Sequence, residues 1–456
     1  MQYQFHGVLS PTDAKRHIGY EFDVPTGTGL LTIEMHHTEG QLDGLSNMLT
    51  LSLFDAQGHR GAGHRMGRPE HNQRVHRIEI TYRQATPGYL PGLTPGRWQI
   101  VVDTHRVTDA QPCTYSIAIQ CQPHPNTATL ADSASPNPPQ RGPGWYRGDL
   151  HGHTVHSDGS WQVADLVAAA KHLKLDFVTL SDHNTISPLA EMDRYSSPDL
   201  LTMGGLELTT FWGHALALGV RDWVDWRVRP DPARSMPMIA EEVMRAGGTY
   251  IIAHPMAIGD PICTGCSWVY ADMRPGPARI VEIWNSGDWD NESFNEQGLA
   301  LYYSWLNQGL RLAATAGTDV HGPYRAGMPL GFNVVYAEAL SEAAILQAIR
   351  AGHLFVSSGP HVELTARSSQ GHTAMMGDLL PQVPATIKAT WRAAEAGMSL
   401  RVIVDGSCVH QQVIQTEGQY EWQTDGQIRW CNIELRDPQG HAAAIANPIF
   451  FGMRNI

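Results

Sequence analysis

The sequence predicts a mixed α/β chain in which a central α/β barrel lies between two β domains. Strand-like and helix-like runs alternate between residues 146 and 360, a pattern typical of a parallel α/β sheet or barrel. Short alternating runs separated by Gly and Pro precede this region, and similar runs follow it. A chain of 456 residues is also too long for one hydrophobic core, so several domains are expected.

The first region, residues 1–122, is predicted to be an antiparallel β-sandwich. Its strand-like runs include residues 31–35, 49–54 and 98–103, and Gly and Pro clusters such as PGYLPGLTPG separate them. Residues 123–145 are rich in Pro, Ser, Ala and Asn and show no periodicity. That composition indicates a linker.

The middle region, residues 146–360, contains seven strand-like runs, a number that suits a small barrel. The runs are residues 146–150, 177–181, 203–208, 215–220, 250–253, 279–284 and 311–316.

Helices are predicted between several of these strands. After the first strand, one apolar face is formed by residues at helical spacing, namely Val163, Leu166, Val167, Ala170 and Leu173. We expect Ser160 or Gly159 to cap this helix. Residues 238–246 and 297–306 also have a helical pattern.

The last region, residues 361–456, is predicted to be a second, smaller β domain. Its strand-like runs are residues 385–391, 400–404 and 428–435.

The charge of the chain argues against nucleic acid and anionic membranes as partners. With 32 basic and 45 acidic residues, the formal net charge is −13, which repels phosphate backbones. The sequence has neither an apolar run of about 18 residues nor the apolar core of a signal peptide, so we expect a cytoplasmic protein.

Of the six cysteines, Cys263 and Cys266 form a CxxC. No second pair follows at short range, so we expect ordinary or redox-sensitive thiols in a loop rather than a zinc knuckle.

Metal-binding residue types recur at the ends of successive predicted strands. They are His151, His153, Asp158, His183, Glu207, His254, Asp319 and His321. The carboxyl ends of parallel strands meet at one edge of a sheet, so these side chains should converge. His214 is the exception, because it opens the fourth strand, and that strand is therefore predicted to run in the opposite direction.

Imidazole and carboxylate groups are good ligands for Zn, Mn and Fe. In the HxH of His151 and His153, and in the DxH of Asp319 and His321, side chains two residues apart point the same way and can reach one ion. Nine candidate ligands exceed the four to six of a single ion. Two or three divalent ions are therefore expected, with Glu207 available as a bridge.

Other polar residues of these loops have plain alternatives. His156 lies among the ligands but at no recurring position, and His172 is expected to be solvated on a helix. We predict that Asp149 and Asp182 orient ligand imidazoles, with capping or surface roles as the alternative. Asp182 and Arg325 are the candidate catalytic residues. Arg325 is predicted to contact an anionic group of the substrate, or else to be a solvated loop arginine.

Three further residues adjoin strand ends. Trp212, Trp284 and Asn285 are expected either to shape the substrate pocket or, for the tryptophans, to pack in the core.

These stretches resemble the PHP (polymerase and histidinol phosphatase) superfamily of metal-dependent hydrolases. The matching segments are GDLHGHTVHSDGS, VTLSDHNT, GLELTTFWGHALALG, IIAHP and AGTDVHG, in that order. The resemblance implies a distorted seven-stranded (β/α) barrel with a two- or three-metal site. The ligands it implies are His151, His153, Asp158, His183, Glu207, His214, His254, Asp319 and His321.

A finer resemblance, in VEIWNSG and AIRAGHLFVSSGP, is to the CehA/McbA-type branch, named for carbamate ester hydrolases. The favoured hypothesis is a phosphoesterase that acts on small phosphate esters through a metal-bridging hydroxide. A carbamate or carboxylic ester hydrolase is the alternative, and a binding protein with a structural metal site is a third. A polymerase-associated exonuclease is disfavoured by the negative charge. The oligomeric state stays open.

Overall fold

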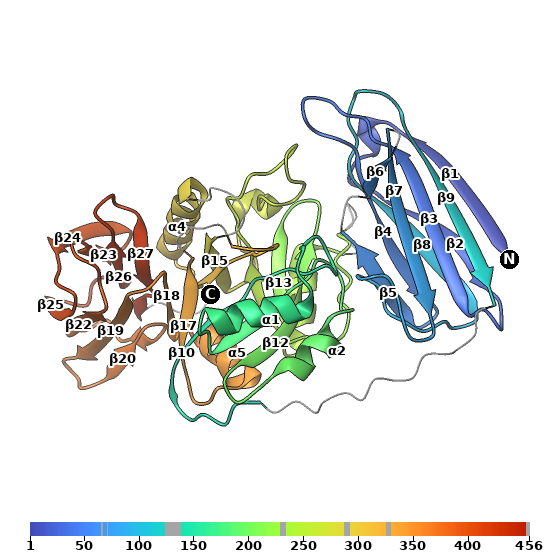
Figure 1. Cartoon of the computed structure of the whole chain (residues 1–456). Helices are drawn as coiled ribbons and strands as arrows, with labels where there is room; N and C mark the ends of the chain where they lie inside the picture. Colours follow the sequence, from blue (N-terminus) through green and yellow to red (C-terminus); the bar gives the residue numbers. More distant parts are fainter. Residues whose placement is uncertain are drawn as a thin grey trace.

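A computed structural model describes most of the chain. The described residues are 1–64, 67–70, 72–123, 138–228, 234–286, 292–324 and 330–452. They form the mixed α/β structure that the sequence predicts, and this structure is rich in strands and has few helices (Figure 1). The N-terminal and C-terminal sheets lie on opposite sides of the central region (Figure 1). Within the described ranges, no helix has the length and apolar character to cross a membrane.

The N-terminal region consists of two antiparallel sheets, ordered β1-β9-β3-β7-β6 and β2-β8-β4-β5. Apolar side chains from both sheets, such as Ile33 and Leu51, share one buried core, which is the sandwich arrangement that the alternating runs predict. The elements are β1 (Gln2–Leu9), the 3-10 helix η1 (Pro11–Asp13), β2 (His17–Val24), β3 (Leu30–Thr38), β4 (Met48–Asp55), β5 (Gly58–Gly63), β6 (Arg68–Glu70), β7 (Gln73–Thr81), β8 (Gly96–Arg106) and β9 (Cys113–Gln122). Residues 124–137 of the predicted linker lie outside the described residues.

The seven predicted central strands all form, and they lie side by side in sequence order. They are β10 (Gly144–Asp149), β11 (Phe177–Leu180), β12 (Leu201–Thr209), β13 (His214–Leu218), β14 (Thr249–Ile252), β15 (Ile280–Asn285) and β16 (Ala313–Gly317). Strand β13 is antiparallel to both of its neighbours, whereas β10–β12 and β14–β16 are parallel. The reversed direction predicted from the position of His214 is therefore confirmed.

The expected closed barrel of seven strands is not what the strand pairing shows. Among the described residues, no ladder joins β16 to β10. Instead β10 pairs with the antiparallel strand β17 (Phe332–Ala337), and β17 pairs with β18 (Leu354–Ser357). The chain turns back after β16, and β17 takes the place beside β10. The sheet then continues from β18 into the C-terminal region.

Two side-chain amides satisfy backbone groups of β16 that a further strand would otherwise pair. Asn333 of β17 accepts from the amide of Ala316 at 2.9 Å and donates to its carbonyl at 2.6 Å. Asn447 does the same for Ala314, at 2.7 Å and 2.9 Å. Buried backbone groups need such partners, so the amides replace the missing ladder.

At the carboxyl ends of the strands, backbone pairing does join the loops that follow β10 and β16. Gly152 and Val320 form a parallel bridge. The amide of Asp319 donates to the carbonyl of His151 at 2.9 Å, and that of His153 donates to Val320 at 2.8 Å. The sheet therefore curves until its first and last parallel strands meet at this end.

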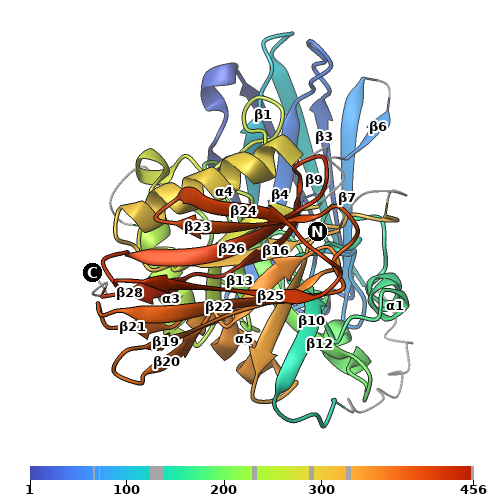
Figure 2. The same cartoon turned by 90° about the vertical axis from the view of Figure 1, so that its left-hand side faces the viewer.

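Helices flank the central sheet (Figures 1 and 2). They are α1 (Val163–His172), α2 (Leu189–Met192), η2 (Asp193–Tyr195), α3 (Met236–Arg245), η3 (Tyr270–Met273), α4 (Glu292–Asn307) and α5 (Glu342–Ala351). The predicted apolar face of α1 is buried through Val163, Leu166, Val167 and Ala170. The predicted cap is wrong. Gln162 holds that position and Asp165 accepts from its amide, because Ser160 instead binds the carbonyl of His321.

The C-terminal region stacks two sheets around a second core. One sheet has the order β20-β19-β22-β25, and the other is the continuation of the central sheet through β27-β26-β23-β24 (Figure 2). Leu364 and Ile433 contribute to the core from the two sides. The strands are β19 (His361–Ser368), β20 (Thr373–Met375), β21 (Leu379–Leu380), β22 (Ala385–Arg392), β23 (Ser399–Val404), β24 (Ser407–Val413), β25 (Gly418–Thr424), β26 (Trp430–Arg436), β27 (Ala442–Ala446) and β28 (Ile449–Phe451).

Candidate metal centre

The structure brings the nine predicted ligand side chains together at one end of the central sheet. Glu207 lies at the middle of the group. Its Oε2 is 3.2 Å from His151 Nε2, 3.3 Å from His153 Nε2 and 3.0 Å from His183 Nδ1. Its Oε1 is 3.0 Å from His214 Nδ1 and 3.1 Å from His254 Nε2. One carboxylate therefore faces five imidazoles from four different loops or strands.

The other two carboxylates link the remaining side chains to this group. Asp319 Oδ1 is 2.9 Å from His153 Nε2 and 3.4 Å from His151 Nε2. Asp158 Oδ1 is 3.4 Å from His183 Nε2 and 3.2 Å from His321 Nε2. All nine side chains thus form one connected cluster.

Several of these atoms are buried and lack a hydrogen-bond partner, which is the observation that tests whether metal ions fit. The atoms are His151 Nε2, His153 Nε2, His214 Nε2, Glu207 Oε2 and Asp319 Oδ1. Burying such atoms unpaired costs about 1–3 kcal/mol each. A shared cation removes that cost, so the donor set fits divalent ions of the Zn, Mn or Fe type.

The ligand atoms fall into three overlapping groups in which all atoms lie within 4.8 Å of one another. The groups are His153, Asp158, His183 and His321; His151, His153, Glu207 and Asp319; and His183, Glu207 and His214. His254 joins the cluster through its contact with Glu207. The buried side chains could therefore hold several ions that share ligands.

Hydrogen bonds to Nδ1 fix the orientation of three of the imidazoles. His151 Nδ1 lies 2.9 Å from Glu282 Oε2, His254 Nδ1 lies 3.1 Å from the carbonyl of Cys266, and His321 Nδ1 lies 2.7 Å from the carbonyl of Asp319. These partners accept, so each Nδ1 carries a proton and each Nε2 keeps its lone pair for a metal ion.

The backbone is strained at two of the ligands. His254 has φ +25° and Asp319 has φ +51°, values that residues other than Gly rarely adopt. Both residues directly follow a strand region, and the positive φ turns their side chains toward Glu207. Strain of about 1–3 kcal/mol at such positions is characteristic of functional sites.

Asp149 and Asp182, which are predicted to orient imidazoles, contact backbone amides and a hydroxyl group of the ligand-bearing loops. Asp149 accepts from the backbone amides of His151 and Thr318, at 3.3 Å and 3.0 Å. Asp182 accepts from the amide of Thr154 at 2.8 Å and from the Ser157 hydroxyl. Both carboxylates therefore hold the ligand-bearing loops, and the catalytic role of Asp182 stays a prediction.

Charge within the cluster is balanced between carboxylates and imidazoles. Burial raises the pKa of Glu207, but the neighbouring imidazoles, chiefly those of His183 and His151, outweigh burial and hold this pKa well below its ordinary range. Burial lowers the pKa of His321, but the carboxylate of Asp158 outweighs burial and raises the pKa to about 9. Metal ions would take the place of these protons, so metal binding releases protons.

The other residues singled out by the sequence have varied positions. Arg325 lies outside the described residues. His172 is exposed, as predicted, and His156 Nδ1 contacts the Ser187 hydroxyl at 2.7 Å, away from the ligand cluster. Trp284 packs in the core, whereas Asn285 Nδ2 donates to Asp319 Oδ2 at 3.1 Å.

Sequence reasoning missed two side chains at the centre. Glu282 is 1% exposed on β15, and nothing in the apolar run VEIW shows which way its carboxylate points. His64 follows β5 of the sandwich, and its ring centroid lies 4.2 Å from that of His183. No sequence signal links His64 to ligands that lie far along the chain.

The CxxC loop also reaches the centre. The structure pairs Cys263 and Cys266 as a disulfide, in place of the two thiols that the sequence analysis expects. A small cavity of about 30 Å³ beside the ligands is lined by both cysteines, His254, Asn285 and Asp319 among others. This cavity is an opening next to the metal-ligand cluster.

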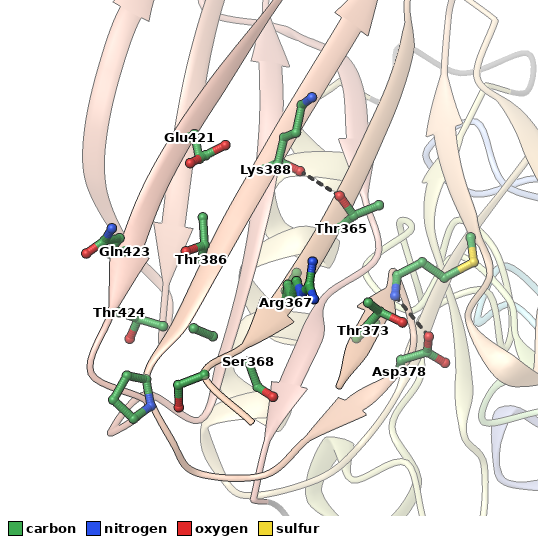
Figure 3. A pocket seen from close by; sticks show the side chains of 16 residues that line it. Thr365, Arg367, Ser368, Thr373, Asp378, Thr386, Lys388, Glu421, Gln423 and Thr424 are labelled. Carbon is green, nitrogen blue, oxygen red and sulfur yellow. Dashed lines mark hydrogen bonds between the residues drawn. The ribbon is translucent and has the colours of Figure 1, made fainter. Parts of the chain in front are cut away.

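A larger cavity than this one lies elsewhere. It is an open groove of about 990 Å³ on the sheet β20-β19-β22-β25 (Figure 3). Figure 3 shows polar side chains along it. Among them, Arg367 and Glu421 are exposed and Lys388 is half-exposed. The groove lacks a buried cluster of unpaired polar atoms, so the described residues make the metal centre the stronger candidate for chemistry.

Comparison with known proteins gives partial matches. No family model matches the chain. An uncharacterized protein of Methanocaldococcus jannaschii is 27% identical over 116 residues, which are 25% of this chain and 49% of that protein. The chain thus spans about half the length of this curated relative.

Three solved structures are similar in part. A two-domain protein of Bacteroides vulgatus that contains a predicted PHP-like metal-dependent phosphoesterase has a TM-score of 0.38 and 14% identity, covering 70% of this chain and 100% of its own. A protein of Bifidobacterium adolescentis, proposed to be a metal-dependent phosphoesterase, has a TM-score of 0.30 and 18% identity, covering 47% and 96%. An amidohydrolase of Chromobacterium violaceum with bound sulfate and no metal has a TM-score of 0.27 and 16% identity, covering 39% and 88%. With TM-scores this low, we base the function on the side chains of the site.

Proposed function

We propose that this chain is a metal-dependent hydrolase that acts on small phosphate esters. The observation that carries the proposal is the set of buried, unpaired ligand atoms that surround Glu207 and Asp319. Structural sites usually close around one ion, whereas this set offers three overlapping positions. Ions that share ligands are typical of two-metal hydrolytic sites.

The resemblance to the PHP superfamily supports this proposal, and so does one motif of the CehA/McbA-type branch. The five PHP-like segments supply the side chains of the cluster. The further segment VEIWNSG supplies Glu282, which holds His151, and Asn285, which holds Asp319. A segment that resembles a hydrolase branch therefore contributes the residues that orient two of the ligands.

Divalent ions bound here would activate water and polarise the ester, so no protein nucleophile is required. The chain's own residues do the positioning. Glu282 and the carbonyl groups of Cys266 and Asp319 keep the Nδ1 protons in place. Three divalent ions against the three ligand carboxylates and Glu282 would leave a net positive site, which favours an anionic phosphoryl group.

A second candidate is a carbamate or carboxylic ester hydrolase. Within the described ranges, the ion pairs of the ligand carboxylates run to histidines, and none runs to an Arg or Lys. A site without such a cation also suits a neutral ester. The two candidates share the metal centre and differ in substrate.

The test is a panel of phosphate, carbamate and carboxylic esters assayed with the full chain in the presence of Mn²⁺ or Zn²⁺. We expect the full chain to hydrolyse phosphate esters and both Asp319→Ala and His151→Ala to lose this activity. Each substitution removes a metal ligand without touching the apolar core. Circular dichroism of both variants should match the wild type. Turnover that survives either substitution with metal content unchanged contradicts the site, and turnover of neutral esters alone makes the second candidate correct.

A further inference from the structure

The N-terminal sandwich contacts the loops that carry the metal ligands. Thr185, two residues after His183, donates its hydroxyl to the carbonyl of Gly88 at 2.7 Å. The amide of Gly88 lies 3.3 Å from His156 Nδ1, in the loop that carries Asp158. Gly88 has φ +94°, and a Cβ there would come within 2.8 Å of the His156 carbonyl, so only Gly permits this close approach.

Further contacts join the sandwich to the CxxC loop. Lys15 forms a salt bridge with Asp260 at 2.6 Å, and Arg106 donates to the carbonyl groups of Pro261 and Ile262 at 2.8 Å and 3.0 Å. The Thr264 hydroxyl donates to the carbonyl of His105 at 3.2 Å. The sandwich therefore touches loops on more than one side of the metal-ligand cluster.

His64 is the sandwich side chain that reaches the cluster itself. It comes directly after Gly63, where an added Cβ would lie 2.8 Å from the Tyr89 hydroxyl. This close packing sets the end of β5 against Tyr89 and directs the following residue toward His183. The rings of His64 and His183 lie 4.2 Å apart at an angle of 40°.

A second histidine supports His64 from within the sandwich. The ring of His105 meets that of His64 edge-on, with centroids 5.2 Å apart and an interplanar angle of 89°. His105 is 2% exposed, and its Nε2 lies 2.9 Å from the Thr50 hydroxyl. The rigid neighbour fixes the plane of the half-buried His64 ring.

We propose that His64 is a substrate-positioning residue of the metal centre, contributed by the N-terminal sandwich. Its ring contacts that of His183, which belongs to the ligand group His153, Asp158, His183 and His321, but His64 itself belongs to none of the three groups. Its imidazole hydrogen-bonds an oxygen of the ester or oxyanion that the ions hold. This inference rests on the proposed hydrolase function, and it makes the sandwich a part of the active site.

The test compares the full-length wild type with His64→Ala, His64→Gln and the control His36→Ala, all loaded with Mn²⁺ or Zn²⁺. His36 is a 40% exposed histidine of the same sandwich, outside the centre. We measure metal content per chain, the Kd of inorganic phosphate by calorimetry, and kcat and KM on the best ester of the panel. The phosphate titration does not depend on turnover.

We expect His64→Ala to keep its metal content and to bind phosphate about 10-fold more weakly, the loss of one hydrogen bond of about 1.4 kcal/mol. Its kcat/KM should fall by a similar factor, mainly through KM. His64→Gln should restore part of both losses, because the amide can hydrogen-bond, and a purely structural role would show no such rescue. His36→Ala should match the wild type.

Two results overturn the proposal: phosphate binding and kcat/KM of His64→Ala within twofold of the wild type, or loss of metal in that variant, which would make His64 a ligand. A wild type that binds phosphate in a His64-dependent way but hydrolyses no ester refutes the proposed function alone. A loaded wild type that neither binds phosphate nor hydrolyses any ester refutes both.

Discussion

Replacing Glu282 should weaken metal binding without unfolding the chain. Glu282 Oε2 lies 2.9 Å from His151 Nδ1, and its Oε1 accepts from Asn285 Nδ2 at 2.8 Å. Asn285 in turn donates to Asp319 Oδ2 at 3.1 Å, so one carboxylate orients two ligands. Glu282 and His151 are both buried, so bulk water does not screen the contact between them.

The size of the effect follows from what each substitution leaves behind. Loss of a carboxylate that orients a metal-bound imidazole typically costs about 10- to 100-fold in metal affinity. Glu282→Gln keeps an acceptor but removes the charge, so we expect a loss near 10-fold, or about 1.4 kcal/mol. Glu282→Ala leaves the Nδ1 proton unpaired, so we expect a loss near 100-fold, or about 2.7 kcal/mol.

The assay is competition for Zn²⁺ against a chelating dye of known affinity, with melting temperatures measured on the same samples. Glu434→Gln is the matched control, because Glu434 is also 1% exposed but lies in the C-terminal region, paired with Arg436. The reasoning is refuted if both Glu282 variants bind Zn²⁺ within twofold of the wild type while their melting temperatures fall like that of the control.

Three further outcomes are expected. Purified, metal-supplemented protein should contain more than one transition metal ion per chain by elemental analysis, and one ion or none would contradict overlapping positions. Arg325→Ala should lower kcat/KM by about 10- to 1000-fold on a phosphate ester and much less on a neutral ester, and equal small losses would remove this residue from the site. His59 is stacked on Trp223, and burial lowers its pKa to about 3. Between pH 6.5 and pH 3 the unfolded chain therefore binds a proton that the folded chain does not bind. The free energy of unfolding thus falls as the pH falls from 6.5 toward 3. Urea unfolding at pH 7 and pH 5 should therefore show a loss smaller by about 2 kcal/mol in His59→Phe than in the wild type, and identical losses would contradict the pKa.

Strand ends explain why much of the centre could be predicted from the sequence. His151, His153, His183 and Asp319 each follow a recognisable strand run, and the parallel arrangement brings such positions to one edge. The same reasoning gave the reversed direction of β13, because His214 precedes its strand. Local patterns suffice where a ligand is tied to the end of a regular element.

The missed features depend on contacts between distant segments. Glu282 lies in a strand whose sequence indicates only a buried core strand, and its partner His151 is 131 residues away in the sequence. His64 follows β5 of the N-terminal sandwich, which belongs to a different sheet from the strands that carry the ligands. The seven strands do not close through a ladder as expected, because β17 takes the place beside β10, and side-chain amides then pair the backbone of β16. Strand periodicity carries no information about any of these three.

The amide of Asn447 ties the C-terminal region to the central region that carries the metal-ligand cluster. It bonds Ala314, on the strand that leads to Asp319, yet it comes from the segment after β27. A chain that ends at the predicted boundary near residue 360 would lack these two hydrogen bonds. The backbone groups of Ala314 would then be unpaired, and unpaired strand backbone is prone to aggregation. Engineering or recombination of this protein should therefore treat the central and C-terminal parts as one exchangeable unit.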